Sequence, residues 1–221
     1  MTDERLAAVA ERYGIQLPAE QIEQLERYCA LIWDWNTKIN LTRHTDYEKF
    51  VSRDLTDSLA FAEFLNRQEK VVDVGSGGGV PGVVLAIVRP DLAITLTESI
   101  GKKAKVLDDV VQRLGLRVGV YHGRAEQLLA QREQDVLVIR AVARLAKVLE
   151  WFQPLWGRFQ RMLVLKGPSW VEERGEARHL GRLHGIELRK RKSYLIPGTG
   201  AESVVLELRR ESGKSEFGIR K

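Results

Sequence analysis

A run of glycines directly after an apolar segment is the part of this sequence with the clearest chemical meaning. Residues 71–74 are three valines and an aspartate, typical of a buried parallel strand. Gly75, Gly77 and Gly79 follow, and glycine allows positive φ and removes the bulk of a Cβ atom. The pattern predicts a strand, a sharp turn and a helix from Val80, with backbone that approaches a ligand; a tight turn without a ligand is the plain alternative.

Two carboxylates near this turn bear on which ligand it would take. Glu98 follows the apolar run 93–97, at about the distance of roughly 20 residues at which an acidic side chain takes the ribose of a dinucleotide. The glycines and Glu98 alone therefore leave nicotinamide cofactors open. Asp73, just before the turn, suits a cofactor that carries an amino acid, such as S-adenosylmethionine, better than an anionic pyrophosphate.

Further polar residues stand where other strands of the predicted sheet end. In an open α/β sheet, ligands bind beyond the carboxyl ends of the strands. Backbone around Ala125 and Glu126 would hold an adenine edge. The cations Arg124, Arg140 and Lys166 remain for an anionic substrate, although each alone is also explained by a surface ion pair.

The sequence places no nucleophile near these residues. The single cysteine, Cys29, falls in a helical pattern and is expected in the core, and His122 at a strand end is more typical of a structural role. A reaction that needs neither a covalent nucleophile nor proton abstraction fits best. Guanine N7 is such an acceptor, because its lone pair attacks a sulfonium methyl once the atoms are aligned.

The elements that must position these residues change character near residue 70. Before it, apolar residues recur at helical spacing, and we expect helices at 4–13, 19–35 and 50–64. After it, strands and helices alternate, which predicts an α/β fold with a parallel sheet covered by helices on both faces. We expect strands at 71–74, 93–97, 118–122, 136–140, 161–166, 187–195 and 203–209, the last two as an antiparallel edge hairpin, and helices at 80–88, 102–114, 125–131, 147–156 and 170–183.

Charge and composition narrow the classes of protein. The 221 residues carry a net charge of +5, which indicates contact with a polyanion. One cysteine excludes a disulfide scaffold and a cysteine-rich metal site, and no metal is expected. The absence of a long apolar run and of a signal core predicts a cytoplasmic protein that does not enter a membrane.

The motifs together resemble the bacterial 16S rRNA guanine-N7 methyltransferases known as RsmG or glucose-inhibited division protein B. The resemblance covers most of the chain. It is carried by the motifs Asn40-Leu41-Thr42, Asp57-Ser58-Leu59, residues 73–82 with 85–90, Lys102-Lys103, Arg140-Ala141-Val142 and Leu165-Lys166-Gly167.

The resemblance implies a Rossmann-like class I S-adenosylmethionine-dependent methyltransferase fold, and methyl transfer to N7 of a guanine in the decoding-region loop of 16S rRNA. Its expected partner is 16S rRNA or the small ribosomal subunit, and the protein is expected to be a monomer. The cofactor shell expected from it is Asp73, Gly75, Ser76, Gly77, Gly79, Val80, Glu98, Ala125, Glu126 and Arg140, and the residues expected to act by positioning and electrostatics are Arg124, Arg140 and Lys166.

Three places depart from the family pattern. Asp54 stands where an Arg-His pair is usual, Ile139 replaces a small polar residue, and Ala201-Glu202-Ser203 replaces a basic stretch. These changes concern RNA contact rather than the cofactor site.

The expected organisation is a helical extension at 1–68, a Rossmann-like core at 69–210 and a mobile charged tail at 211–221. Two other functions stay open on the residues alone. One is a nicotinamide-dependent oxidoreductase that uses the same turn and Glu98. The other is an RNA-binding or ribosome-assembly protein without catalysis.

Overall fold

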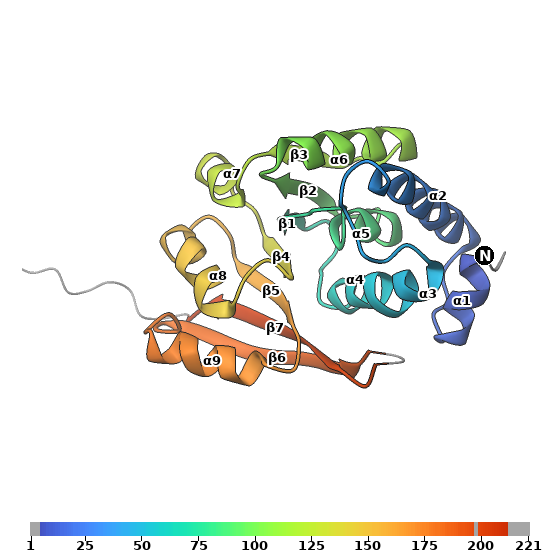
Figure 1. Cartoon of the computed structure of the whole chain (residues 1–221). Helices are drawn as coiled ribbons and strands as arrows, with labels where there is room; N and C mark the ends of the chain where they lie inside the picture. The colour runs from blue at the N-terminus through green and yellow to red at the C-terminus, as the bar shows by residue number, and fades with distance from the viewer. Residues whose placement is uncertain (1–4, 197–198, 212–221) are drawn as a thin grey trace, which may run out of the picture.

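A seven-stranded sheet forms the centre of the computed structural model, which describes residues 5–196 and 199–211 (Figure 1). The strand order is β3-β2-β1-β4-β5-β7-β6. Strands β1 to β5 are parallel to one another, and β7 runs antiparallel to both β5 and β6. The strands are β1 (Lys70–Val74), β2 (Ala93–Glu98), β3 (Gly119–His122), β4 (Val136–Arg140), β5 (Arg161–Lys166), β6 (Ile186–Leu195) and β7 (Glu202–Arg210).

The middle strands are buried on both faces, as their continuous apolar runs predict. All residues of β1 after Lys70 are buried, and so are the first four of β4. Because β1, β2, β4 and β5 are parallel, their carboxyl ends lie at one edge of the sheet. The residues that follow these strands are therefore brought close together.

Helices cover the two faces and enclose two apolar cores. One face is covered by α2 (Ala19–Asn36), α5 (Gly82–Val88) and α6 (Gly101–Leu114), and the other by α7 (Ala125–Gln131), α8 (Leu145–Phe152) and α9 (Trp170–His179) (Figure 1). Helix α1 (Leu6–Arg12) packs against α2 at the outside of the first face. The alternation of strands and helices predicted from the sequence is confirmed.

The helix expected at 50–64 is wrong in its type and bounds. A short helix, α3 (Tyr47–Lys49), leads into a π-helical segment, η1 (Phe50–Leu55), and only then into α4 (Thr56–Ala62). The wider π turn alters which side chains lie on one face, a change that apolar spacing alone does not reveal. Five of the six residues of η1 are buried, and the exception is Arg53.

Helix α5 begins at Gly82 rather than at Val80. The chain is still turning at Gly79, whose φ is +107°, and Pro81 lies at the N-cap position after a cis peptide bond. Pro81 thus precedes the first turn instead of lying in it.

Two other helices end earlier than expected. Helix α8 ends at Phe152, and a short 3₁₀ helix containing Pro154 follows, because proline has no N–H to continue the α-helical pattern. Helix α9 ends at His179, since Gly181 takes a positive φ of +68°.

The last two strands form the antiparallel edge hairpin predicted from the sequence, with β7 inside and β6 at the edge. Residues 197–198 of the connection, residue 4 of the first expected helix and the tail from residue 212 lie outside the described residues. The division of the chain into an extension, a core and a tail remains a prediction.

Candidate active site

The glycine-rich turn between β1 and α5 has the backbone that the sequence predicts. Gly75, Gly77 and Gly79 have φ values of +69°, +57° and +107°, a region that side chains other than glycine adopt only with strain. Among the described residues, a Cβ added at Gly77 would meet nothing closer than the Gly75 carbonyl oxygen at 3.9 Å. Backbone at Gly77 therefore faces open space in which a ligand fits.

Asp73 lies beneath the turn rather than in front of it. Its side chain is buried, and Oδ2 accepts a hydrogen bond of 3.0 Å from the backbone N–H of Gly82, the first residue of α5. Burial raises the pKa of this carboxyl to about 6, although the hydrogen bonds it accepts oppose the shift. Asp73 thus faces the first amide of α5, and the described part of the chain gives it no cationic partner within ion-pair distance.

Glu98 at the end of β2 holds the turn from the other side. Its two carboxylate oxygens accept hydrogen bonds from the N–H of Gly77 at 3.0 Å and of Ile100 at 2.7 Å. Glu98 is only 6% exposed, yet each carboxylate oxygen retains a lone pair for a ribose hydroxyl. The carboxylate thus links the glycine turn to the position where a ribose is expected.

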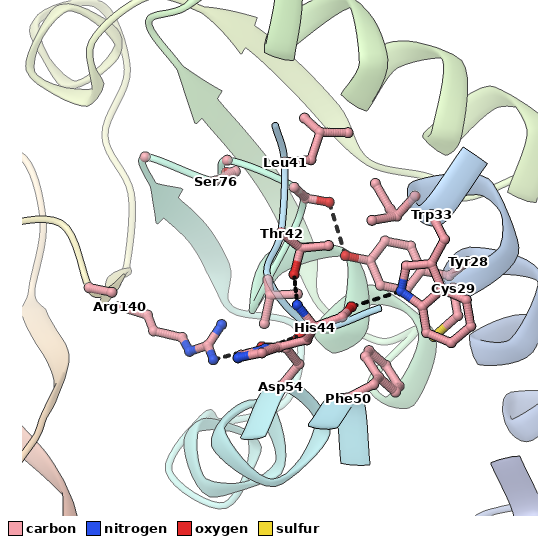
Figure 2. Close-up of a pocket in the computed structure, with 16 residues that line it drawn as sticks. Tyr28, Cys29, Trp33, Leu41, Thr42, His44, Phe50, Asp54, Ser76 and Arg140 are labelled. Carbon is pink, nitrogen blue, oxygen red and sulfur yellow. Dashed lines mark hydrogen bonds and ion pairs between the residues drawn. The ribbon is translucent and has the colours of Figure 1, made fainter. Parts of the chain in front are cut away.

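A cavity of about 280 Å³ lies in front of the turn (Figure 2). The turn supplies one wall and the end of β4 supplies another. Aromatic side chains of α2 and η1 and the segment around Leu41 close the remaining side. It brings together Gly75, Ser76, Gly77, Val80 and Arg140 of the expected cofactor shell, whereas Asp73, Gly79, Glu98, Ala125 and Glu126 are not among its lining residues.

Arg140 is fixed by two buried carboxylates. Its Nε donates to Asp57 Oδ2 at 2.8 Å and its Nη2 donates to Asp54 Oδ1 at 2.7 Å. The side chains of both aspartates are about 95% buried, at 6% and 5% exposure, and that of Arg140 is 17% exposed. Burial alone would lower the pKa of Arg140, but the two carboxylates raise it above its usual value. The guanidinium is therefore charged and held in one orientation.

Two further side chains extend this network at its ends. His44 Nδ1 lies 2.9 Å from Asp54 Oδ2, and the Tyr194 hydroxyl donates to Asp57 Oδ1 at 2.6 Å (Figure 2 shows the His44 end). Asp54, Asp57, His44 and Tyr194 were not expected to form a site. The two aspartates meet at Arg140, and His44 and Tyr194 each contact one of the aspartates; no sequence spacing signals these contacts.

A second cavity, of about 490 Å³, meets the first at Arg140 and Ala141. Ala141 has a φ of +55°, which is uncommon for a residue with a side chain and occurs at functional sites. The second cavity is bounded by η1, the segment after β4, the end of β5 and the start of β7, and its lining includes Arg53, Arg144, Lys166 and Glu202.

Lys166 lies in the second cavity but is already engaged. Its Nζ contacts Glu173 Oε2 at 2.7 Å and donates to the carbonyl oxygen of Ala143, and its side chain is 9% exposed. The Glu173 carboxylate also accepts from the N–H of Leu145 at 2.7 Å, at the start of α8. Lys166 therefore holds the loop after β4 in place.

Arg124 stands away from both cavities, so the three expected cations are not brought together. Its guanidinium pairs with Glu126 at 2.9 Å and lies 5.3 Å from the centre of the Trp151 ring. Ala125 is buried at the start of α7. Any contact of Ala125 with an adenine would involve backbone rather than its methyl group.

The three departures from the family pattern have separate structural consequences. Asp54 supplies one of the two carboxylates on Arg140. Ile139, on β4, is buried in the core that α7, α8 and α9 cover. Residues 201–203 line the second cavity.

Comparison with known proteins agrees with this geometry. Residues 21–196 match the model of a family described as rRNA small subunit methyltransferase G. The chain is 45% identical over 202 residues to ribosomal RNA small subunit methyltransferase G of Rhodopirellula baltica, covering 91% of this chain and 87% of that protein. It is 36% identical to the protein of the same name from Pseudomonas aeruginosa, with coverage of 94% and 95%.

Solved structures at low identity share the fold. MtNAS in complex with S-adenosylmethionine superposes with a TM-score of 0.55 at 18% identity, covering 93% of this chain and 77% of that one. A precorrin-6y C5,15-methyltransferase of Geobacter metallireducens gives a TM-score of 0.52 at 12% identity, covering 80% and 96%.

The parallel sheet with one antiparallel strand inserted before its edge, and a glycine turn at its centre, define the Rossmann-like fold of class I methyltransferases. The family match adds the activity, methyl transfer that depends on S-adenosylmethionine. Within that class, the chain belongs to the rRNA small subunit methyltransferase G family. In the part of the chain that the structure describes, no helix combines the length and apolar character needed to cross a bilayer.

Proposed function

We propose that this protein transfers a methyl group from S-adenosylmethionine to N7 of a guanine in the decoding-region loop of 16S rRNA, acting as a monomer in the cytoplasm. The observation that carries the proposal is the meeting of two cavities at Arg140 and Ala141. One is walled by the glycine turn and suits the cofactor. The other is lined by cations and suits a nucleotide.

The residues of the first cavity fit the proposed cofactor. Open space in front of Gly77 admits a ligand against the backbone, and Glu98 is available to a ribose. The remaining proposed contacts come from Asp73 beneath the turn, from Gly75, Ser76, Gly79 and Val80, and from Ala125, Glu126 and Arg140. S-adenosylmethionine supplies an electrophilic methyl on a positively charged sulfur.

The charged groups at the junction support an acceptor that needs no general base. Arg140 and Asp54 are engaged with each other, and His44 is held by Asp54. Guanine N7 carries no proton in neutral guanine, so alignment of the reacting atoms is sufficient for catalysis. In this proposal Arg140 and Lys166 act by positioning and electrostatics, and Arg124 contributes from outside both cavities.

The test is transfer of labelled methyl from S-adenosylmethionine to small ribosomal subunits and to deproteinised 16S rRNA. Reduction and aniline cleavage of the product, which break the chain at 7-methylguanosine, should locate the label at one guanine of the decoding region. Binding of RNA without any methyl transfer would favour an assembly protein. Label on another atom or base would contradict the proposal.

A further inference from the structure

The start of β7 lies at the edge of the sheet where substrates bind. Because β7 runs antiparallel to β5, with Val204 opposite Lys166, its first residues lie beside the carboxyl end of β5. Glu202, the first residue of β7, consequently lines the second cavity.

Glu202 is a carboxylate without a partner. The residue is partly buried, and the described residues offer its side chain no hydrogen bond or ion pair, although Arg53, Arg144 and Lys166 line the same cavity. Arg144 and Lys166 are neutralised by Glu176 and Glu173. The cavity thus holds an acceptor that no group among the described residues uses.

Arg53 is the matching donor. It extends from η1 on another wall, and within the described chain its guanidinium too has no ion pair or hydrogen bond. The two opposite charges lie more than ion-pair distance apart across the cavity. An unfilled space between a free guanidinium and a free carboxylate favours a ligand that is an acceptor on one side and a donor on the other.

Guanine has this arrangement along one edge. Going round the base from N7, the groups are the acceptor O6 and then the donors N1–H and N2–H₂. In an orientation with N7 at the junction of the two cavities and O6 toward Arg140 and Arg53, the two donors point into the second cavity. A carboxylate there accepts both N–H groups at once.

We propose that Glu202 recognises the target base by accepting hydrogen bonds from guanine N1–H and N2–H₂, which makes it a specificity-determining residue. This inference rests on the proposed function. It also gives Glu202 an effect on rate, because methylation at N7 leaves the ring positively charged. Hydrogen bonds from the ring to a carboxylate strengthen as that charge develops, so the transition state is stabilised more than the bound substrate.

The carboxylate also explains which part of the RNA enters the second cavity. A phosphate group would be repelled by Glu202, whereas a neutral base edge with two donors is attracted. Adenine offers no N1–H and no N2 amine, and it would leave the carboxylate unpaired. The second cavity therefore selects guanine over adenine, and a base over a phosphate of the RNA backbone.

The experiment compares two RNAs with two proteins. After the methylated guanine is mapped, 16S rRNA is ligated from two pieces so that inosine, which lacks only the N2 amine, stands at that position. We expect the wild-type protein to lose about tenfold in kcat/KM on the inosine RNA, the value of a hydrogen bond to a charged group. Glu202→Gln should lower kcat/KM on guanine and discriminate between guanine and inosine less than about threefold.

Controls separate recognition from folding and from charge. Glu172→Gln, at an exposed glutamate of α9 outside the second cavity, should behave as wild type on both RNAs. Binding of S-adenosylmethionine, measured by calorimetry, should be equal in all three proteins.

The outcomes distinguish the two proposals. If no guanine N7 is methylated by the wild-type protein, the proposed function fails. If guanine N7 is methylated but wild type uses inosine equally well, or Glu202→Gln keeps the wild-type discrimination, the role of Glu202 is overturned while the proposed function stands. Tighter RNA binding by Glu202→Gln with unchanged discrimination would likewise overturn it, as an effect of charge alone.

Discussion

The cavity in front of the glycine turn takes one wall from a continuous stretch of chain, residues 75–80, whereas the contacts that hold Arg140 between the two cavities join residues 83 and 86 positions apart. The first region is shaped by backbone that only glycine permits. The second is shaped by buried charges that must neutralise one another. The difference shows that the turn is specified locally, while the orientation of Arg140 depends on the whole fold.

The largest effect is expected from removal of Arg140, the cation that Asp54 and Asp57 share. Arg140→Met leaves Asp54 and Asp57 buried without their cation, and we expect a loss of about 3 to 5 kcal/mol in the free energy of unfolding at pH 7.5. Urea denaturation measures it. Burial already raises the pKa of Asp57, and its protonation would remove one stranded charge, so the loss should be smaller at pH 5.

Arg144→Met provides the matched control for this variant. Arg144 pairs with Glu176 at 2.7 Å, but its side chain is 58% exposed and the pair is screened by water, so its removal should cost far less stability than removal of Arg140. An equal loss in both variants would mean that the Arg140 contacts contribute no more than a surface pair.

The next effect belongs to the glycine turn. A Cβ on Gly82 would lie 2.2 Å from Leu96 Cδ2 and 2.6 Å from Asp73 Oδ2, and Gly82→Ala should therefore cost about 3 kcal/mol of stability, as overpacking of a filled core does. At Gly157 the described residues leave an added Cβ free of contacts, and Gly157→Ala should be close to neutral in the same urea titration.

Gly77→Ala separates backbone strain from packing in the glycine turn. The added Cβ has space, so the only cost to the fold is the strain of an alanine at a positive φ. The variant should lose about 1 kcal/mol of stability and most of its affinity for S-adenosylmethionine in calorimetry. Full affinity would show that the ligand does not approach this backbone.

These two regions also explain how much the sequence could predict. The turn, its positive φ values and the positions of Glu98 and Arg140 at strand ends follow from local pattern and from the geometry of parallel sheets. The side of the turn on which Asp73 lies does not follow from them. Strand alternation does not predict that Gly82 and the start of α5 cover its carboxylate.

The network around Arg140 could not be predicted for a different reason. Asp54 reaches Arg140 from a π-helical segment, and the helical spacing of apolar residues gives no indication of such a segment. Tyr194 reaches Asp57 from the edge strand, 137 residues further along the chain. Such pairs are fixed by tertiary packing, and a single sequence carries no signal for them.

The last of these predictions tests whether burial of Asp73, for which the described residues offer no cation within ion-pair distance, disfavours its charged form. Burial raises the pKa of Asp73 to about 6, above the 3.8 of a free aspartate. A group with a raised pKa favours the folded state when protonated, so its stabilising contribution is complete below about pH 3.8 and is lost as the pH rises through about 6. Asp73→Asn keeps an acceptor for the Gly82 N–H and removes the titration.

Relative to Asp73→Asn, the wild-type protein should therefore lose about 2 kcal/mol of unfolding free energy between pH 4.5 and pH 7.5. Asp91→Asn is the control with the opposite sign, because the hydrogen bond from Arg89 lowers the pKa of Asp91 to about 2. Its difference from wild type should be constant over the same range. A constant difference for Asp73→Asn as well would show that the hydrogen bonds at the turn compensate the burial of Asp73, and the contrast between the two regions would then be one of backbone alone.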